Sequence, residues 1–271
     1  MPNPPPVVLC FSGHDPTGGA GLQADIETLS RLGCHACTVV TALTAQDTSN
    51  VRVVLPQKKS DFLQQARLVI ADLPISAVKI GLLGSTDIAL AVAALLADEL
   101  AGVPVVLDPV LAAGGGRAMA SADLVEVIRS RLLPLASIAT PNIPEARQLA
   151  CGMESDGDCA AELLRLGCQQ VLLTGTHAAS GAVVNRLYRR QGMLSWEWPR
   201  LPYEYHGSGC TLASALAAGL AKQLALEDAC LQAQQFTLAS LNSGFVLGKG
   251  QHLPNRCIKL ESFGTERVSA G

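Results

Sequence analysis

The chain alternates between short apolar runs and segments with helical spacing, and this alternation limits the folds open to it. The run "VVLCFS" (residues 7–12) predicts a buried strand. The segment that follows repeats apolar residues at helical spacing, at Leu22, Ile26, Leu29 and Leu32. Because apolar strands separated by helices need crossover connections, we predict a three-layer α/β/α fold whose mostly parallel central sheet is covered by helices on both faces.

The same patterns place further elements along the chain. Strands are predicted at 36–45, 77–83, 103–110, 136–140 and 169–175, and a hairpin at 181–201 that turns at Gln191–Gly192. Helices are predicted at 20–33, 61–73, 86–102, 121–133, 143–151, 158–167, 209–224 and 226–248, with Thr86 as an N-cap and Pro144 in a first turn. Since no repeat or composition shift divides these elements, we expect a single domain over 1–271, with 1–6 and about 255–271 as tails.

Charge and cysteine content exclude several classes of protein. The net charge of -3 gives no positive field for nucleic acid or an anionic membrane surface. No apolar run reaches the roughly 18 uncharged residues that a membrane span needs. The nine cysteines include one C-x-x-C, at Cys34 and Cys37, but no second pair at zinc spacing. The start "MPNPPP" lacks the basic and apolar parts of an export signal. We therefore expect a cytoplasmic protein with mostly buried, free cysteines.

Two polar stretches follow the first two predicted strands, at the sheet edge where ligands of such folds bind. "GHDPTGGAGLQAD" (residues 13–25) is neither a Walker loop nor a dinucleotide fingerprint. Its glycines indicate either close approach to a ligand or a plain strand-to-helix turn. Gln46 comes just after the second strand, and its carboxamide can pair with an aminopyrimidine edge or simply face water.

The second half of the chain contains acidic candidates in similar positions. Asp108 ends a predicted strand, and "TPNIPEA" places Asn142 and Glu145 three residues apart at the start of a helix. This spacing is typical of helix capping, in which each side chain satisfies a backbone amide of the first turn. The same groups could also reach Mg²⁺ through water.

The stretch "HGSGCTLAS" places a tight turn at the start of an Ala-rich helix. The backbone amides of Gly207, Ser208, Gly209 and Cys210 would converge there and form an anion site able to neutralise a phosphoryl group in transfer. The alternative is a helix packed so closely that only glycine fits. At this position the helix dipole is expected to lower the pKa of the Cys210 thiol, which makes Cys210 a candidate base or positioning group.

Taken in order, these stretches resemble the hydroxymethylpyrimidine kinase/phosphomethylpyrimidine kinase family of thiamin biosynthesis, within the ribokinase-like superfamily. The resemblance runs from residue 9 to about 250 through "GHDPTGGAGLQAD", "TALTAQDT", "VKIGLLGS", "VVLDPV", "TPNIPEA", "HGSGCTLASALAAGL" and "GKG". It implies a ribokinase-like fold, a homodimer, and two successive phosphorylations of 4-amino-5-hydroxymethyl-2-methylpyrimidine by Mg-ATP. The broader superfamily usually has Asp where this chain has Cys210.

The resemblance also implies roles for particular residues. Gln46 would read the pyrimidine, in a pocket lined by Gly13, Ala20, Thr44 and Leu82. Cys210 would lie nearest the hydroxymethyl group, with residues 207–210 as the anion hole. Mg²⁺ would be arranged by Asp108, Asn142 and Glu145, directly or through water. Lys249 would lie near the nucleotide, as would Thr174, which stands where family members often carry Lys.

Two alternative functions remain open at this stage. A pyridoxine or pyridoxal kinase would share the anion hole and the phosphoryl transfer. A non-catalytic pyrimidine sensor would bind the ligand without turnover, but it would have no need of an anion site for a transition state. The anion site at residues 207–210 therefore favours a small-molecule kinase over a sensor, and the resemblance implies that its partners are ATP and an aminopyrimidine alcohol.

Overall fold

The computed structural model describes residues 3–112, 119–176 and 181–258. Within these residues the core is a nine-stranded sheet in the order β3-β2-β1-β4-β5-β6-β7-β8-β9. The six strands from β2 to β7 in this order run parallel, and β3, β8 and β9 are antiparallel at the two edges. The strands are β1 (Val7–His14), β2 (His35–Gln46), β3 (Val51–Pro56), β4 (Ile75–Ile80), β5 (Val105–Leu107), β6 (Ile138–Ala139), β7 (Val171–Leu173), β8 (Ala182–Arg189) and β9 (Gly192–Pro199).

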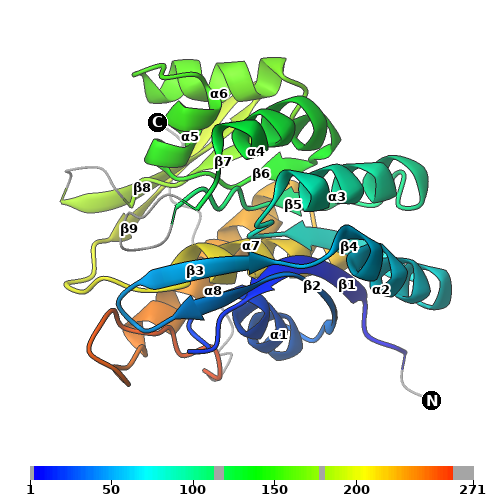
Figure 1. The fold of residues 1–271 in the computed structure, drawn as a ribbon. Coiled ribbons are helices and arrows are strands. Elements are labelled where there is room, and N and C mark those ends of the chain that lie inside the picture. Colours follow the sequence, from blue (N-terminus) through cyan, green and yellow to red (C-terminus); the bar gives the residue numbers. More distant parts are fainter. Residues whose placement is uncertain (1–2, 113–118, 177–180, 259–271) are drawn as a thin grey trace.

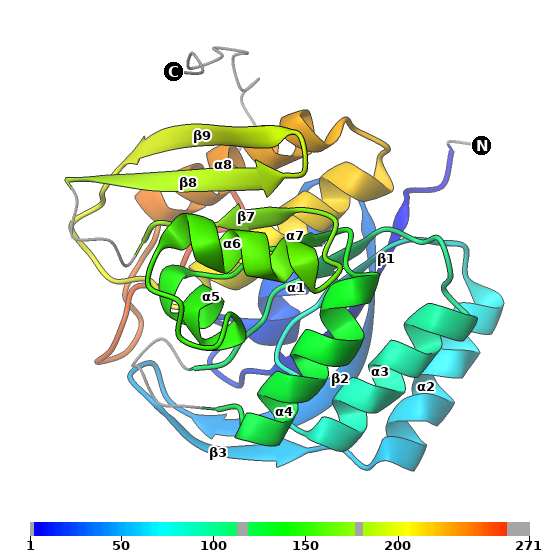
Figure 2. The ribbon, with the colours of Figure 1, turned by 90° about the horizontal axis from the view of Figure 1, so that it is seen from above.

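Helices cover both faces of this sheet (Figures 1 and 2). They are α1 (Gly21–Arg31), α2 (Lys59–Asp72), α3 (Thr86–Asp98), α4 (Ala122–Val127), α5 (Ile143–Leu149), α6 (Asp156–Arg165), α7 (Ser208–Ala221) and α8 (Leu226–Asn242). Helices α2 to α6 enclose one apolar core, which includes Phe62 and Ile88. Helices α1, α7 and α8 enclose the other, which includes Leu216 and Phe236. The predicted three-layer α/β/α fold is therefore confirmed.

Several boundaries differ from those expected. Strand β3 was not predicted, because a short, half-exposed edge strand resembles a loop. The N-cap of α3 is Ser85, whose hydroxyl accepts from Ile88 N–H, and not Thr86. The helix expected over 121–133 is not α-helical throughout. Helix α4 passes into a wider π-helical turn at Ile128–Leu132 and then into a tighter 3₁₀ turn at Leu133–Leu135.

The C-terminal part of the chain also departs from expectation. The hairpin pairs Arg189 with Gly192, so its turn lies one residue earlier than predicted. Helix α8 ends at Asn242, and the apolar residues that follow form a β-bridge in which Phe245 and Leu253 exchange backbone hydrogen bonds of 3.0 and 2.8 Å. The local pattern predicts a helix that continues to residue 248, because it contains no sign that Phe245 pairs with Leu253, which lies outside the helical segment.

Two further findings bear on the chemistry. All nine cysteines are free, and six of them are buried. Over the described part of the chain, no helix has both the length and the apolar character needed to cross a bilayer.

Candidate functional site

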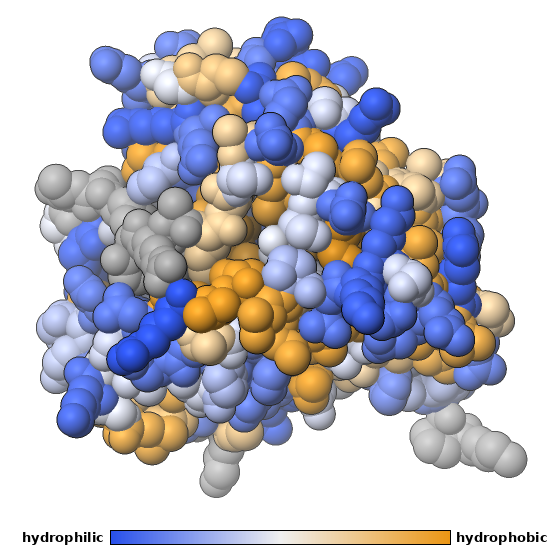
Figure 3. Space-filling view, viewed as in Figure 1, coloured by the Kyte–Doolittle hydropathy of each residue, from blue (hydrophilic) through white to orange (hydrophobic). Residues whose placement is uncertain are grey.

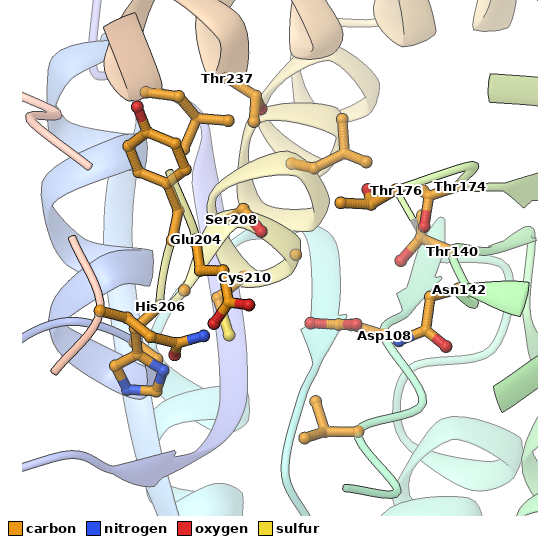
Figure 4. Close-up of a pocket in the computed structure, with 18 of the residues that line it drawn as sticks. Asp108, Thr140, Asn142, Thr174, Thr176, Glu204, His206, Ser208, Cys210 and Thr237 are labelled. Carbon is orange, nitrogen blue, oxygen red and sulfur yellow. The ribbon is translucent and has the colours of Figure 1, made fainter. Parts of the chain in front are cut away.

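A cavity of about 590 Å³ opens where the parallel strands end and α7 begins (Figure 4). Every predicted site residue except Lys249 lines it. These residues are Gly13, Ala20, Thr44, Gln46, Leu82, Asp108, Asn142, Glu145, Thr174, Gly207, Ser208, Gly209 and Cys210. Residues that are far apart in the sequence therefore share one site, as expected at the carboxyl edge of a parallel sheet.

The turn before α7 has the geometry of an anion site. Helix α7 starts at Ser208, and Gly207 caps it in the left-handed region with φ of 84°. The first intrahelical amide to find a partner is that of Thr211, which donates to Gly207 O over 3.0 Å. The amides of residues 208–210 are thus available to a ligand, because no carbonyl within the helix precedes the first turn to accept their hydrogen bonds. We refer to residues 207–210 as the anion turn.

Gly207 and Gly209 of the anion turn differ in how closely their surroundings pack against them. A Cβ on Gly207 would lie 1.9 Å from the carbonyl oxygen of Gly19, so this position must be glycine for packing. A Cβ on Gly209 would meet its nearest atom, Asp108 Oδ1, only at 3.9 Å. Close packing, one of the two alternatives posed from the sequence, therefore explains Gly207 but not Gly209.

The expectation of a reactive Cys210 thiolate is wrong for this structure. Burial raises the pKa of the Cys210 thiol to about 12; the Lys79 ammonium opposes this rise, while Asp108 and Asp25 add to it. The helix start alone would lower the pKa, but desolvation outweighs it. At neutral pH the group facing the cavity is a protonated thiol.

The capping interpretation of Asn142 and Glu145 is correct. Asn142 Oδ1 accepts from Glu145 N over 2.9 Å, and Glu145 Oε2 accepts from Asn142 N over 3.0 Å. Burial and the nearby Asp108 raise the pKa of Glu145 to about 8. Burial also raises the pKa of Asp108 to about 6, against the lowering effect of Lys79. The Asp108 carboxyl group thus hinders the ionisation of Glu145, while Asp25 adds to the rise in the pKa of Asp108.

Asp108, Asn142 and Glu145 are the residues expected to hold a metal ion. Within the described residues, no group of three or more acidic, His or Cys side chains forms a metal cage. Asp108 Oδ2 is buried and has no hydrogen-bond partner in the described structure, so it offers one free oxygen to the cavity. Mg²⁺ usually keeps several waters and takes only one or two protein carboxylates, together with substrate phosphates. The site fits such a water-bridged ion.

The opposite part of the cavity suits a small polar ring. Gln46 ends β2 beside a register shift in its pairing with β3, and its side chain makes no hydrogen bond within the described structure. Thr44 Oγ1 donates to His14 O over 2.9 Å, which ties β2 to the last residue of β1. A Cβ on Gly13 would lie 2.8 Å from Leu82 Cδ2, so these two residues form a tight wall. The Gln46 carboxamide is left free to pair with a ligand.

The structure does not bring Lys249 to the cavity. Its loop is held instead against Thr48: Gly250 N donates to Thr48 Oγ1 over 3.1 Å, and Gln251 N donates to Thr48 O over 3.0 Å. Lys249 itself is exposed. Its expected place near a nucleotide came from the resemblance alone, and no local pattern could have shown where this loop packs.

Sequence reasoning also missed Arg256, which lies in the expected C-terminal tail. The residue is 2% exposed, and its guanidinium donates to Thr211 Oγ1 over 2.9 Å. It also donates to the carbonyls of Gly18 and Gly19, and pairs with Glu27. Arg256 therefore fastens the loop between β1 and α1 (residues 15–20, the glycine loop) to the first turn of α7. This part of the expected tail belongs to the fold, and residues 259–271 lie outside the described residues.

Asp15 and His206 form a second missed link between the same two segments. His206 Nε2 lies 2.8 Å from Asp15 Oδ2, which also accepts from Ala20 N over 2.9 Å. Asp15 Oδ1 accepts from the backbone and hydroxyl of Thr17. The Asp-Pro-Thr-Gly order of the loop is a typical turn signal and could have revealed Asp15.

We expect Asp15→Asn to destabilise the protein in a pH-dependent way. Burial alone would raise the pKa of Asp15, but hydrogen bonds from His206 and Thr17 hold it at about 2. Since the pKa is lower in the folded than in the unfolded chain, the stabilisation, about 2 kcal/mol, is present above pH ~4 and is lost as the pH falls towards 2. Urea denaturation across this range should show the gap to wild type closing. A gap of constant size would contradict the assignment.

Comparison with known proteins gives consistent matches over nearly the whole chain. A family model described as phosphomethylpyrimidine kinase matches residues 15–255. A hydroxymethylpyrimidine/phosphomethylpyrimidine kinase of Streptomyces coelicolor is 39% identical, over 92% of this chain and 93% of that protein. A thiamine biosynthesis bifunctional protein of Geobacter sulfurreducens is 37% identical over 96% of this chain, which spans 54% of that longer protein.

Among solved structures, an ADP complex of Bacillus subtilis pyridoxal kinase is similar in fold. It superposes with a TM-score of 0.85 at 27% identity, over 93% of this chain and 97% of that one. A phosphomethylpyrimidine kinase of Clostridium difficile also superposes, with a TM-score of 0.76 at 31% identity, over 87% of this chain and 99% of that one. The fold is thus similar both to a pyridoxal kinase and to a phosphomethylpyrimidine kinase.

Proposed function

The chain belongs to the phosphomethylpyrimidine kinase family, and from this premise we propose how its cavity works. The protein phosphorylates 4-amino-5-hydroxymethyl-2-methylpyrimidine with ATP, and then the monophosphate, to give the diphosphate used in thiamin biosynthesis. The observation that carries the proposal is that one cavity holds a free carboxamide, Gln46, and a helix start with open amides, the anion turn. The first suits an aminopyrimidine and the second suits a phosphoryl group.

The pyrimidine lies between Gly13, Ala20, Thr44 and Leu82, with its ring edge on Gln46. In this position its hydroxymethyl group points to Cys210 and the anion turn. The hydroxyl attacks the γ-phosphate in line, and the amides of residues 208–210 stabilise the charge that spreads over the phosphoryl oxygens. Little covalent help is needed, because positioning and charge neutralisation account for most of the catalysis in phosphoryl transfer.

The nucleotide occupies the side of the cavity formed by Thr174, α8 and the β8–β9 hairpin. The hairpin is tied to its neighbours by a buried amide network that supports this wall. Asn185 Oδ1 accepts from Gly175 N over 3.0 Å, and its Nδ2 donates to Gln234 Oε1 over 2.9 Å. Trp198 Nε1 donates to the same oxygen over 2.7 Å. The sequence left this hairpin without a role. We assign it to the side of the cavity that holds the nucleotide.

Mg²⁺ would be held at the acidic wall by Asp108 and Glu145, with Asn142 keeping Glu145 in place through the capping box. When bound, the ion neutralises charge on the nucleotide phosphates. Asp108 supplies an oxygen without a competing partner. Glu145 is already engaged by Asn142 N–H, so it acts through water.

Gln46→Ala is expected to raise the KM for the pyrimidine alcohol about 30-fold, because a ligand loses two hydrogen bonds worth roughly 1 kcal/mol each. The KM for ATP should stay within about twofold, since the carboxamide lies at the opposite end of the cavity. Gln46→Glu keeps the shape but removes the donor, and it should fall between wild type and Gln46→Ala. Steady-state kinetics measure all three proteins. An unchanged pyrimidine KM would place the ring elsewhere.

The function itself is tested by mass spectrometry of the products formed from the aminopyrimidine alcohol and Mg-ATP. We expect the monophosphate first and the diphosphate later. The fold likeness to pyridoxal kinase makes that activity the second candidate, so pyridoxal is assayed beside the pyrimidine and the kcat/KM values are compared. A higher value for pyridoxal would reverse the assignment. Binding without ADP release would indicate a pyrimidine sensor.

We also propose that the protein is a single-domain homodimer of the cytoplasm. Apolar side chains gather on the face that carries β3 (Figure 3). Leu43, Val53 and Leu55 of the β2–β3 pair are 40%, 46% and 50% exposed, which suits a subunit contact. Sedimentation equilibrium gives the mass in solution. Nine free thiols are typical of a reducing compartment.

A further inference from the structure

Lys79 is a fully buried cation next to the cavity. Its side chain is 0% exposed, yet it carries an ammonium group among the apolar residues of a central strand. Nζ donates to Asp25 Oδ1 over 2.8 Å and to Ser12 Oγ over 3.1 Å. Ser214 Oγ also donates to Asp25 Oδ1, over 2.7 Å. The proposed roles of the cavity residues make no use of this group.

The ion pair lies one helical turn behind the anion turn. Lys79 is in β4, whose neighbouring residues Val78 and Ile80 face the α2–α6 core, so Lys79 points to the α1 and α7 side. Cys210 and Ser214 are four residues apart in α7 and therefore share one face of the helix. Since Ser214 holds Asp25 and Asp25 holds Lys79, the ammonium lies beneath that face.

The space for the ammonium is built into the backbone. A Cβ on Gly81 would lie 2.7 Å from both Lys79 Nζ and Ser12 Oγ. Only glycine at this position leaves the ammonium and the hydroxyl undisturbed. The charge of Lys79 acts on the cavity residues: it lowers the pKa values of both Cys210 and Asp108, against the larger effect of burial, and Asp25 opposes it with a smaller effect in the other direction.

Stability alone does not explain such a pair. Desolvating two charges costs free energy that their attraction often fails to repay, and apolar residues of similar volume are frequently as good or better. A cation at the base of an anion site, however, favours a state with extra negative charge in the cavity over one without it.

We propose that Lys79 is a fixed positive charge behind the anion turn that stabilises the phosphoryl group during transfer, and that Asp25 and Ser214 hold it in place. The inference rests on the phosphoryl transfer proposed above. Lys79 acts through its field, because it has no exposed surface with which to touch the substrate. It should therefore matter more for the transition state than for the binding of either substrate.

The test removes both charges together, because removing one would leave the other buried and unpaired. We expect Lys79→Met/Asp25→Asn to lower kcat about 100-fold, as for the loss of one strong oxyanion contact, with both KM values within about threefold. Affinity for Mg-ADP with fluoroaluminate and the alcohol, a mimic of the transferring group, should fall by a similar factor. Affinity for Mg-ADP alone should not.

Ser214→Ala is the matched control, since it loses a hydrogen bond to Asp25 but keeps both charges. If the ion pair is merely structural, each variant should lose as much affinity for Mg-ADP alone as for the mimic. That result would overturn the inference. So would a kcat within threefold of wild type in the doubly neutral variant. Lys79→Gln/Asp25→Asn, which can retain a hydrogen bond, replaces it if circular dichroism shows that the first variant does not fold. An inactive wild type would instead overturn the proposed function, and the inference with it.

Discussion

Gly207→Ala is expected to lower kcat at least about a thousandfold, because several anion-site donors would move together and each is worth roughly 100-fold or more. The added Cβ would lie 1.9 Å from Gly19 O and 2.9 Å from Arg256 Nη2, both of which are held by other contacts. The turn must therefore shift away from the glycine loop. Single-turnover kinetics with the pyrimidine alcohol measure the loss.

Gly152→Ala is a close control for this prediction. Gly152 has a φ of 83°, against 84° for Gly207, but a Cβ there would meet nothing within 4 Å. Its substitution therefore carries the same backbone strain, about 1–2 kcal/mol, without the collision. We expect it to lower the melting temperature slightly and leave kcat within about twofold. Equal losses of kcat in the two variants would mean that the anion turn is not part of the reaction.

Cys210→Ala is expected to slow the first phosphorylation about 100-fold, the size of effect that follows a misplaced nucleophile, and the second at most about threefold. In the first step the attacking group is a neutral hydroxyl, which the thiol orients. In the second step it is a phosphate oxygen that is already anionic and needs no help to lose a proton. Because the pKa of Cys210 is about 12, a protonated thiol and not a thiolate does this work. Single-turnover assays with each acceptor separate the two steps.

Cys210→Ser distinguishes orientation from base catalysis. A serine hydroxyl can orient the substrate but is an even weaker acid than the thiol, so it cannot form the anion that a base needs. We expect it to retain the first step within about tenfold of wild type. A serine variant as slow as Cys210→Ala would point to a thiolate base. Equal losses in both steps would mean that Cys210 only supports the turn.

The parts of the fold and site that follow from local pattern were predictable. The alternation of apolar runs and helical segments predicts the layered parallel sheet. Gln46 and Asp108 were expected at the cavity because they lie at the ends of predicted strands, and Gly207 because it lies just before a predicted helix. Position relative to a strand end is a local property, and the sheet edge gathers such residues whatever their distance in the sequence.

What depends on three-dimensional neighbours was not predictable. The pKa of Cys210 follows from burial and from Lys79, Asp108 and Asp25, which come from other elements. Lys79 stood in the middle of "AVKIGLL" as the only charged residue of a buried strand, which was the one signal available for it. The loop that carries Lys249 and the buried Arg256 are placed by contacts with segments about 200 residues away, which no periodicity records.

The contacts of Arg256 have a consequence for how the protein is made. All nine strands and eight helices of the described structure precede Arg256 in the sequence. During synthesis the sheet and its helices can assemble before this guanidinium leaves the ribosome, but the glycine loop and the start of α7 then have the Asp15–His206 contact without the contacts of Arg256. The nascent chain would therefore pass through a stage in which the sheet and its helices are folded while the glycine loop and the start of α7, which line the cavity, are not yet fully fixed.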